Sequence, residues 1–154
     1  MTIRVSRDEV HVHVDFYGWA LQEADDSLIP ARYPSGKDDS KGRLVTPRSG
    51  RLDIASAGHT HTAFLVAEVW ESEPPRDEGE KWDACEDARI FSHTGRLAVC
   101  VTTTKQLDRI TLGRPETTWH TRVYCTGRDE VFRLAQLDVP EGIERYLVQF
   151  WPAS

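Results

Sequence analysis

Two short segments carry His-x-His pairs, an arrangement from which many metal sites are built. The first is HVHVD at residues 11–15, and the second is GHTHT at residues 58–62. Alternate residues of a β-strand point to the same face, so His11, His13 and Asp15 would project together. Two imidazoles and a carboxylate are ligands that zinc or non-haem iron accepts. The first pair is therefore one candidate metal site.

The residues around these histidines favour a simpler interpretation. Val10, Val12 and Val14 alternate with the polar residues, which is typical of a strand with one buried face and one face in water. We expect the histidines of both pairs to point outward from such strands. On this interpretation the chain binds no metal and no other cofactor.

The second pair resembles the first motif of cupins, which are small β-barrels. In GHTHTAFLVAE the resemblance implies a metal site made by His59, His61 and Glu68. Six residues separate His61 from Glu68, which is more than in cupins, and no second cupin motif follows. A small-molecule or metal-binding β-barrel, which could be an enzyme, is the alternative function. The chain has no Gly-x-Ser-x-Gly elbow and no glycine-rich phosphate loop, so we assign no catalytic residues.

A strongly acidic segment covers residues 71–87, with the sequence ESEPPRDEGEKWDACED. It holds eight carboxylates against two basic side chains, an excess as large as the net charge of the whole chain, −6. Such a patch raises the rate at which a basic partner associates, and a tryptophan can supply desolvated contact area. The predicted partner-binding residues are Glu71, Glu73, Asp77, Glu78, Glu80, Trp82 and Asp83.

Two other roles of this segment stay open. It could be a solvated loop whose charge keeps a sheet edge from pairing with other chains. It could also hold calcium, although the Asp-x-Asp-x-Asp-Gly order of many calcium loops is absent.

The charge balance bears on the class of partner. Nucleic-acid binders usually carry a basic face, because neutralising phosphates supplies most of their affinity. A net charge of −6 without a Lys/Arg cluster disfavours direct nucleic-acid binding. The working hypothesis is a non-catalytic protein-binding module of the immunity or inhibitor type that neutralises a basic toxin or nuclease. A structural subunit joined to an assembly through a sheet edge is a third hypothesis, and the oligomeric state is not predicted.

Alternating runs of residues predict an all-β fold. Strands are expected at residues 9–19, 51–57, 59–71, 82–91, 97–103, 107–112, 118–126 and 143–151, separated by turn residues. This pattern in 154 residues indicates a single-domain antiparallel β-sandwich, with a jelly-roll-like or barrel arrangement as the alternative. Residues 128–136 are expected to form a strand or turn. Residues 22–50 are expected to form a long irregular loop that is functional or partly mobile.

The three cysteines and the chain's first residues bear on the compartment. Cys85, Cys100 and Cys125 are odd in number and well separated, which favours buried thiols in a reducing compartment. The segment MTIRVSRDEV lacks the apolar core of a signal peptide. No apolar run approaches the ~20 residues that cross a bilayer. We therefore expect a cytoplasmic protein without a membrane partner.

Two family resemblances can be read from longer blocks. GHTHTAFLVAEVWESEPP, TWHTRVYCTGRDE and IERYLVQFWPA resemble a group of small uncharacterised actinobacterial all-β proteins, which supplies no catalytic residues. The closing pattern of Gly142, Tyr146 and Phe150 is similar to that of ComJ-like competence proteins. That second resemblance implies an inhibitor of a nuclease.

Overall fold

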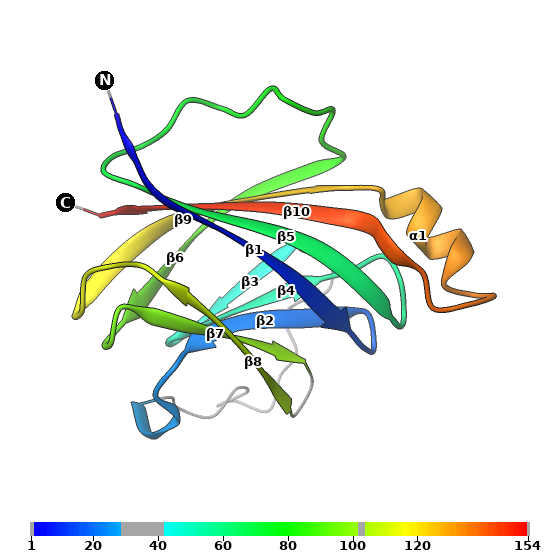
Figure 1. The fold of residues 1–154 in the computed structure, drawn as a ribbon, viewed down its shortest axis with the longest axis horizontal. Helices are drawn as coiled ribbons and strands as arrows, with labels where there is room; N and C mark the ends of the chain where they lie inside the picture. Colours follow the sequence, from blue (N-terminus) through cyan, green and yellow to red (C-terminus); the bar gives the residue numbers. More distant parts are fainter. Residues whose placement is uncertain (1, 29–41, 102–103, 154) are drawn as a thin grey trace.

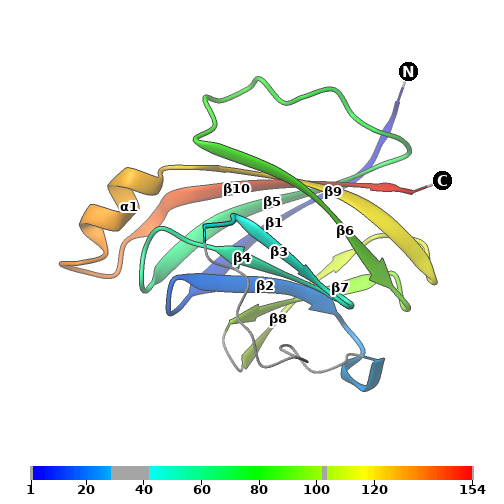
Figure 2. The ribbon, with the colours of Figure 1, turned by 180° about the vertical axis from the view of Figure 1, so that it is seen from behind.

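The chain folds into two five-stranded sheets that pack face to face (Figures 1 and 2). The computed structural model describes residues 2–28, 42–101 and 104–153. Sheet A has the strand order β1 (Arg4–Val14), β5 (His61–Trp70), β10 (Glu141–Pro152), β9 (Thr117–Thr126) and β6 (Ala84–Ser92). Sheet B has the order β3 (Val45–Arg48), β4 (Arg51–Ala55), β2 (Gly18–Glu23), β7 (Arg96–Val101) and β8 (Thr104–Thr111). The predicted all-β sandwich is confirmed, and the two sheets do not close into the alternative barrel.

Among the described residues, neighbouring strands are antiparallel except for β5 and β10. β10 lies parallel to β5 and antiparallel to β9, in the centre of sheet A. Parallel neighbours need a long connection between them, and here the connection contains β6 to β9 and a short helix, α1 (Arg128–Leu134). Sheet A is therefore mixed, which the predicted antiparallel arrangement did not include.

Three segments differ from their predicted structure. The single strand expected at 9–19 is interrupted, because the chain reverses between β1 and β2 at Phe16 and Tyr17, whose φ angles are 51° and 61°. Residues 128–134 form α1, which follows a left-handed Gly127 with φ of 81°, where a strand or turn was expected. The loop expected at 22–50 begins with the end of β2 and a 3-10 turn, η1 (Asp26–Leu28), and ends with β3. Its central residues, 29–41, lie outside the described residues.

The core lies between the two sheets and explains the alternating strands. β1 turns Val10, Val12 and Val14 inward, and these side chains are at most 5% exposed. The inward faces of the other strands add aliphatic and aromatic side chains, so that one continuous cluster fills the sandwich. Trp19 of sheet B meets Tyr146 of sheet A edge to face at 5.0 Å. These contacts fix how the two sheets face each other.

Two side chains bridge the edge strands of the two sheets, one on each side of the sandwich. Gln106 of β8 accepts a 2.8 Å hydrogen bond from the backbone N–H of His13 and donates a 2.9 Å bond to the carbonyl of His11. On the other side, Glu86 of β6 accepts bonds from the backbone N–H groups of Leu44 and Val45, at 2.8 and 3.0 Å. Both side chains satisfy backbone groups at strand edges that would otherwise invite pairing with another chain.

Candidate functional site

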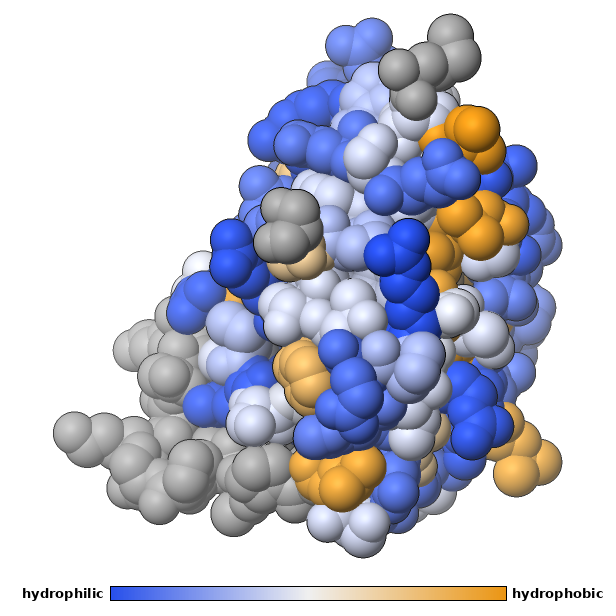
Figure 3. Space-filling model, turned by 90° about the vertical axis from the view of Figure 1, so that its left-hand side faces the viewer, coloured by the Kyte–Doolittle hydropathy of each residue, from blue (hydrophilic) through white to orange (hydrophobic). Residues whose placement is uncertain are grey.

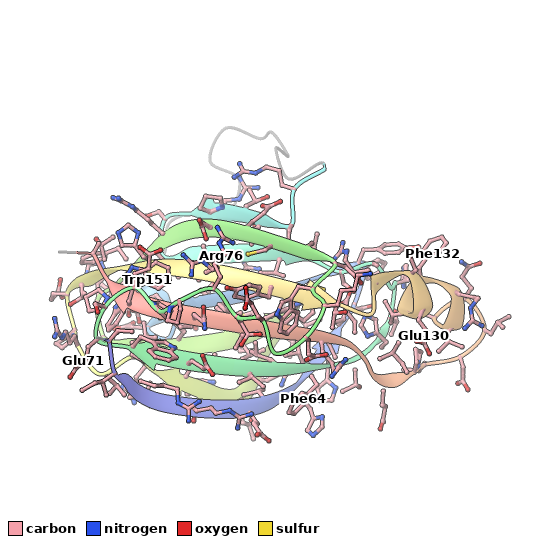
Figure 4. All side chains as sticks on the ribbon, turned by 90° about the horizontal axis from the view of Figure 1, so that it is seen from above. Phe64, Glu71, Arg76, Glu130, Phe132 and Trp151 are labelled. Atoms are coloured by element: carbon pink, nitrogen blue, oxygen red, sulfur yellow. The ribbon has the colours of Figure 1, made fainter. Side chains whose placement is uncertain are left out.

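The acidic segment forms a strap across the outer face of sheet A. Residues 71–83, called here the acidic strap, leave the end of β5, arch over the sheet and enter β6 (Figures 1 and 4). Figure 4 looks down on the strap, with Glu71 near one end and Arg76 over the sheet. The strap therefore presents its acidic side chains on one broad face of the sandwich.

Arg122 of β9 is the main anchor beneath the strap. Its guanidinium donates to Glu73 at 2.7 Å, to the carbonyl of Pro74 at 3.2 Å and to Asp87 of β6 at 3.2 Å. The same group lies over the ring of Trp151, 5.0 Å from its centroid. Burial opposes the charge of Arg122, but the bond to Glu73 and its other polar contacts raise its pKa above the ordinary value. The strap is thus held by a cation that stays protonated.

A second anchor shapes the middle of the strap. The backbone N–H of Asp77 donates to the hydroxyl of Tyr124 at 2.9 Å. The Asp77 carboxylate accepts bonds from Trp82 Nε1 at 2.9 Å and from the N–H of Gly79 at 3.1 Å. The Trp82 ring lies 5.3 Å from that of Tyr124. Asp77 and Trp82, both predicted as partner contacts, therefore also fold the strap itself.

Two further predicted residues have partners within the protein. Glu80 pairs with Arg145 of β10 at 2.5 Å, and Asp83 accepts a 3.2 Å bond from the backbone N–H of Arg128 at the start of α1. For Glu71 and Glu78, no side-chain hydrogen bond or ion pair is found among the described residues. These two exposed carboxylates are therefore the predicted site residues with the most freedom to meet a partner.

A groove lies beside the strap on the same face. It has a volume of about 320 Å³, and its lining includes Phe64 and Val66 of β5 together with Leu147 of β10. The strap contributes Trp82, and Arg7 of β1 lines the groove as well. The groove thus combines an apolar floor with charged walls, a combination suited to desolvating one side chain of a partner.

The fold does not bring the first histidine pair and Asp15 together as the three-ligand set that the sequence offered. His11 and His13 are exposed on β1, as predicted, and His11 packs against Phe64 at 5.6 Å between ring centroids. The carboxylate of Asp15 is used in the turn after β1, where it accepts bonds from Thr60 Oγ1 at 2.9 Å and from the N–H of Phe16 at 3.0 Å. No cluster of three or more His, Cys, Asp or Glu that could hold a metal was found within the described ranges.

The cupin-like set is also separated by the fold. His59 is exposed, whereas His61 is 2% exposed and points into the core. Glu68 lies on the opposite face of β5, where it accepts bonds from Trp70 at 3.0 Å and Gln149 at 3.1 Å. The expectation that the histidines of both pairs point outward is wrong for His61. It shares the inward face of β5 with an apolar series that ends at Val69, so it was placed on the wrong side.

His61 belongs to a buried polar network that sequence analysis did not identify. Ser56 donates a 2.6 Å hydrogen bond to the Glu144 carboxylate, and Tyr146 donates another at 2.6 Å. Ala57 N–H donates to the second oxygen of Glu144 at 2.9 Å, and Arg128 lies 3.6 Å from it. Since the Ser56 hydroxyl donates to Glu144, His61 Nε2–H donates to Ser56 Oγ, at 2.8 Å.

This network has the residue types of a catalytic triad without its geometry. Glu144 and Ser56 both face Nε2 of His61, whereas a triad places the acid and the nucleophile on opposite nitrogens of the ring. Burial lowers the pKa of His61, so the ring is neutral. Burial, together with Glu144, raises the pKa of the neighbouring Cys125 to about 12, so its thiol is protonated. The arrangement fits a fastening of the loop between β4 and β5 to β10 and α1.

Known proteins resemble this chain in structure but not in sequence. No protein-family model matches the chain, and no curated protein matches it by sequence. The crystal structure of ComJ from Bacillus subtilis, described as an inhibitor of the DNA degrading activity of NucA, aligns with a TM-score of 0.62 at 10% identity over 99% of each chain. The fold is similar to that of ComJ.

A second solved structure extends this result. The protein described as crocagin biosynthetic gene J aligns with a TM-score of 0.65 at 14% identity, over 97% of this chain and 100% of that one. At these identities the likeness establishes a shared fold. The resemblance to an actinobacterial group has no support from these comparisons and stays a prediction.

The residues behind the ComJ-like resemblance have structural roles here. Gly142 has a φ of 70° near the start of β10, while Tyr146 and Phe150 are at most 1% exposed in the core. Their spacing therefore reflects how the closing strand packs. Across the described residues, no helix has the length and apolar character to span a membrane.

Proposed function

We propose that this protein is a non-catalytic inhibitor-type protein that binds a basic protein partner, of the nuclease class, through the acidic strap. The observation that carries the proposal is the strap itself, an acidic segment fastened over sheet A by Arg122, Tyr124 and Arg145. ComJ, whose fold is similar, is described as an inhibitor of a nuclease. That description supports the class of partner proposed here.

The physical basis is competition with phosphate. A nuclease attracts DNA through basic groups that neutralise phosphates. Carboxylates held on a rigid surface, led by Glu71 and Glu78, would be drawn to the same groups and occupy them. Rigidity matters because a strap already ordered in the free protein loses little conformational entropy on binding. The groove beside the strap would then receive an apolar or cationic side chain of the partner, against Phe64 and Trp82.

The predicted seven-residue site is refined by the internal contacts. Glu73, Asp77, Glu80 and Asp83 shape the strap through bonds within the protein, and their charges add to its field. Glu71 and Glu78 are proposed as direct contacts, and Trp82 as the aromatic contact. We propose the cytosol as the compartment, where the three free cysteines would stay reduced.

A DNA-degradation assay tests this function. The purified chain is added in molar excess to each basic nuclease encoded in the genome of its source, with ComJ and NucA as the positive control. The proposal expects stoichiometric inhibition of at least one of these nucleases. If ComJ inhibits NucA in the same assay and the chain inhibits none of them, the proposed function is wrong.

A further inference from the structure

The turn between β1 and β2 holds two aromatic residues in a strained backbone conformation. Asp15 and Gly18 form an isolated bridge, and Gly18 N–H donates to the carbonyl of Asp15 at 3.1 Å. Phe16 and Tyr17 between them both have positive φ. Such two-residue turns are usually made by Asn-Gly or Asp-Gly, because a left-handed conformation costs other residues about 1–2 kcal/mol each. The chain therefore carries two bulky rings where the backbone favours small residues.

Packing in the core does not explain these rings. Phe16 is 67% exposed and Tyr17 is 48% exposed. Both instead pack edge-on against His59, at 5.0 Å between ring centroids. Tyr17 N–H donates to the carbonyl of His59 at 3.1 Å, and Ser56 N–H donates to the carbonyl of Tyr17 at 2.9 Å. The two rings are therefore held in place while most of their surface meets water.

The buried network beneath the turn makes this arrangement rigid. Ser56 Oγ accepts a 3.1 Å bond from Gly58 N–H, and Glu144 holds both Ser56 and Ala57. Gly58 packs so closely on His61 that a Cβ at that position would lie 2.6 Å from the ring. The loop that carries His59 is thus fixed from below. Aromatic groups fixed in this way lose little freedom when a partner covers them.

Other apolar side chains gather at the same end of the sandwich. Of the ten large hydrophobic residues exposed in the described part of the chain, five lie here, namely Phe16, Tyr17, Phe132, Leu137 and Val139. α1 and the turn between β1 and β2 lie at this end (Figure 1), where Figure 4 labels Glu130 and Phe132 of α1. In Figure 3, the coloured part of the opposite end is largely hydrophilic, with apolar residues in separate spots. Phe16, Tyr17, Phe132, Leu137 and Val139 together are called here the aromatic end.

Exposed carboxylates lie in and beside α1 at the aromatic end. Asp129, Glu130, Asp138 and Glu141 are all exposed, and Arg133 is the exposed basic residue among residues 129–141. This acidic rim would repel the rim of a second copy of the chain and an anionic bilayer. A basic protein surface is complementary to it, and its Arg or Lys side chains can also stack on exposed aromatic rings.

We propose that the aromatic end is the contact that a basic protein partner desolvates, with Phe16 and Tyr17 as its anchors. The basic charge of the partner is taken from the proposed function, on which this inference rests. The new element is the aromatic end as the surface that supplies most of the affinity. The acidic strap continues toward this end, because Asp83 bonds the backbone of Arg128 and Thr126 donates to the carbonyl of Lys81. A partner on the aromatic end can therefore also meet the end of the strap at Asp83.

The test places a photo-crosslinking amino acid, p-benzoylphenylalanine, at position Tyr17 of the full chain in cells of its source. The control places it at Leu107, which is 96% exposed on β8. The captured protein is identified, purified and measured with the wild type and with a Phe16→Asn/Tyr17→Gly variant. That variant keeps the turn and removes both rings. We expect a basic protein crosslinked at position 17 alone, and a Kd about 30-fold weaker for the variant through faster dissociation.

Stability separates loss of the contact from loss of the fold. Asn-Gly relieves the strain of the turn, so the variant should unfold at a higher temperature than the wild type while it binds more weakly. Equal binding by the variant, or capture only of lipid, of a second copy of the chain, or of nothing, would overturn the inference. If the chain inhibits no nuclease but crosslinks a basic protein at position 17, the nuclease class of the partner is rejected and the aromatic end stands as the contact.

Discussion

Ser56 donates a 2.6 Å hydrogen bond to Glu144, although 88 positions separate them in the chain. Both side chains are buried, and the bond joins the loop after β4 to the central strand of sheet A. The same loop carries His59, which supports the exposed turn between β1 and β2. One buried carboxylate thus organises the surface at this end of the sandwich.

Replacing Glu144 with Gln is expected to destabilise the fold by about 3 kcal/mol, because the new amide turns donors toward groups that already donate. Urea unfolding gives the free energy. Glu141→Gln, an exposed change on the same strand, is the matched control and should stay within about 0.5 kcal/mol of the wild type. Equal stability of the two variants would show that Glu144 does not organise this region.

Arg122→Gln is expected to release the acidic strap, since Glu73, Pro74 and Asp87 all lose their donor. Trypsin should then cleave after Arg76 and Lys81 much faster than in the wild type, because a protease needs a segment that can open locally. Arg89→Gln, an exposed arginine on β6, serves as the control. Unchanged cleavage in Arg122→Gln would mean that the strap is held by other contacts.

The buried carboxylate of Glu23 should make the stability of the fold depend on pH. Burial by itself would raise the pKa of Glu23, but bonds from the N–H groups of Asp25 and Thr94 and from the hydroxyls of Thr94 and Ser92 lower it from 4.5 to about 2. A carboxyl with a lowered folded-state pKa stabilises the fold above its unfolded-state pKa, and this stabilisation is lost as the pH falls toward the folded value.

The wild type should therefore lose stability between pH 4.5 and pH 2 more steeply than Glu23→Gln, by about 2–3 kcal/mol over this range. Urea unfolding at stepwise lower pH measures the difference. Glu78→Gln, an exposed change in the strap, should follow the wild type. Parallel curves for the wild type and Glu23→Gln would show that the carboxylate is not held ionised in the fold.

The strands could be predicted because one face of each is buried. In β9 the alternation of Trp119, Thr121, Val123 and Cys125 gives both the element and its inward face. The pairing of β5 with β10 could not be predicted, because a pattern within one strand carries no information on its neighbour. The helix α1 was missed since it has seven residues and one buried side chain, Val131, too few for a helical period to be visible.

The polar residues show where alternation is insufficient. Alternation puts Arg122 on the face of β9 opposite Trp119 and Val123, but the strap that buries it comes from elsewhere in the chain. His61 could have been assigned inward from Ala63 and Leu65, which follow it on the same face of β5. The buried imidazole of His61 is tolerated because Ser56 and Glu144 lie beside it. Only the tertiary fold brings these three residues together.

The salt dependence of association with the inhibited nuclease tests the role of the acidic strap most directly. Stopped-flow rates are compared for the wild type, Glu71→Lys/Glu78→Lys and a control, Asp26→Lys/Glu116→Lys, which changes the net charge equally at exposed sites outside the strap. The strap variant is expected to associate about tenfold more slowly at low salt, with a flatter salt dependence, while the control changes little. Identical rates and salt slopes for the wild type and the strap variant would contradict this expectation.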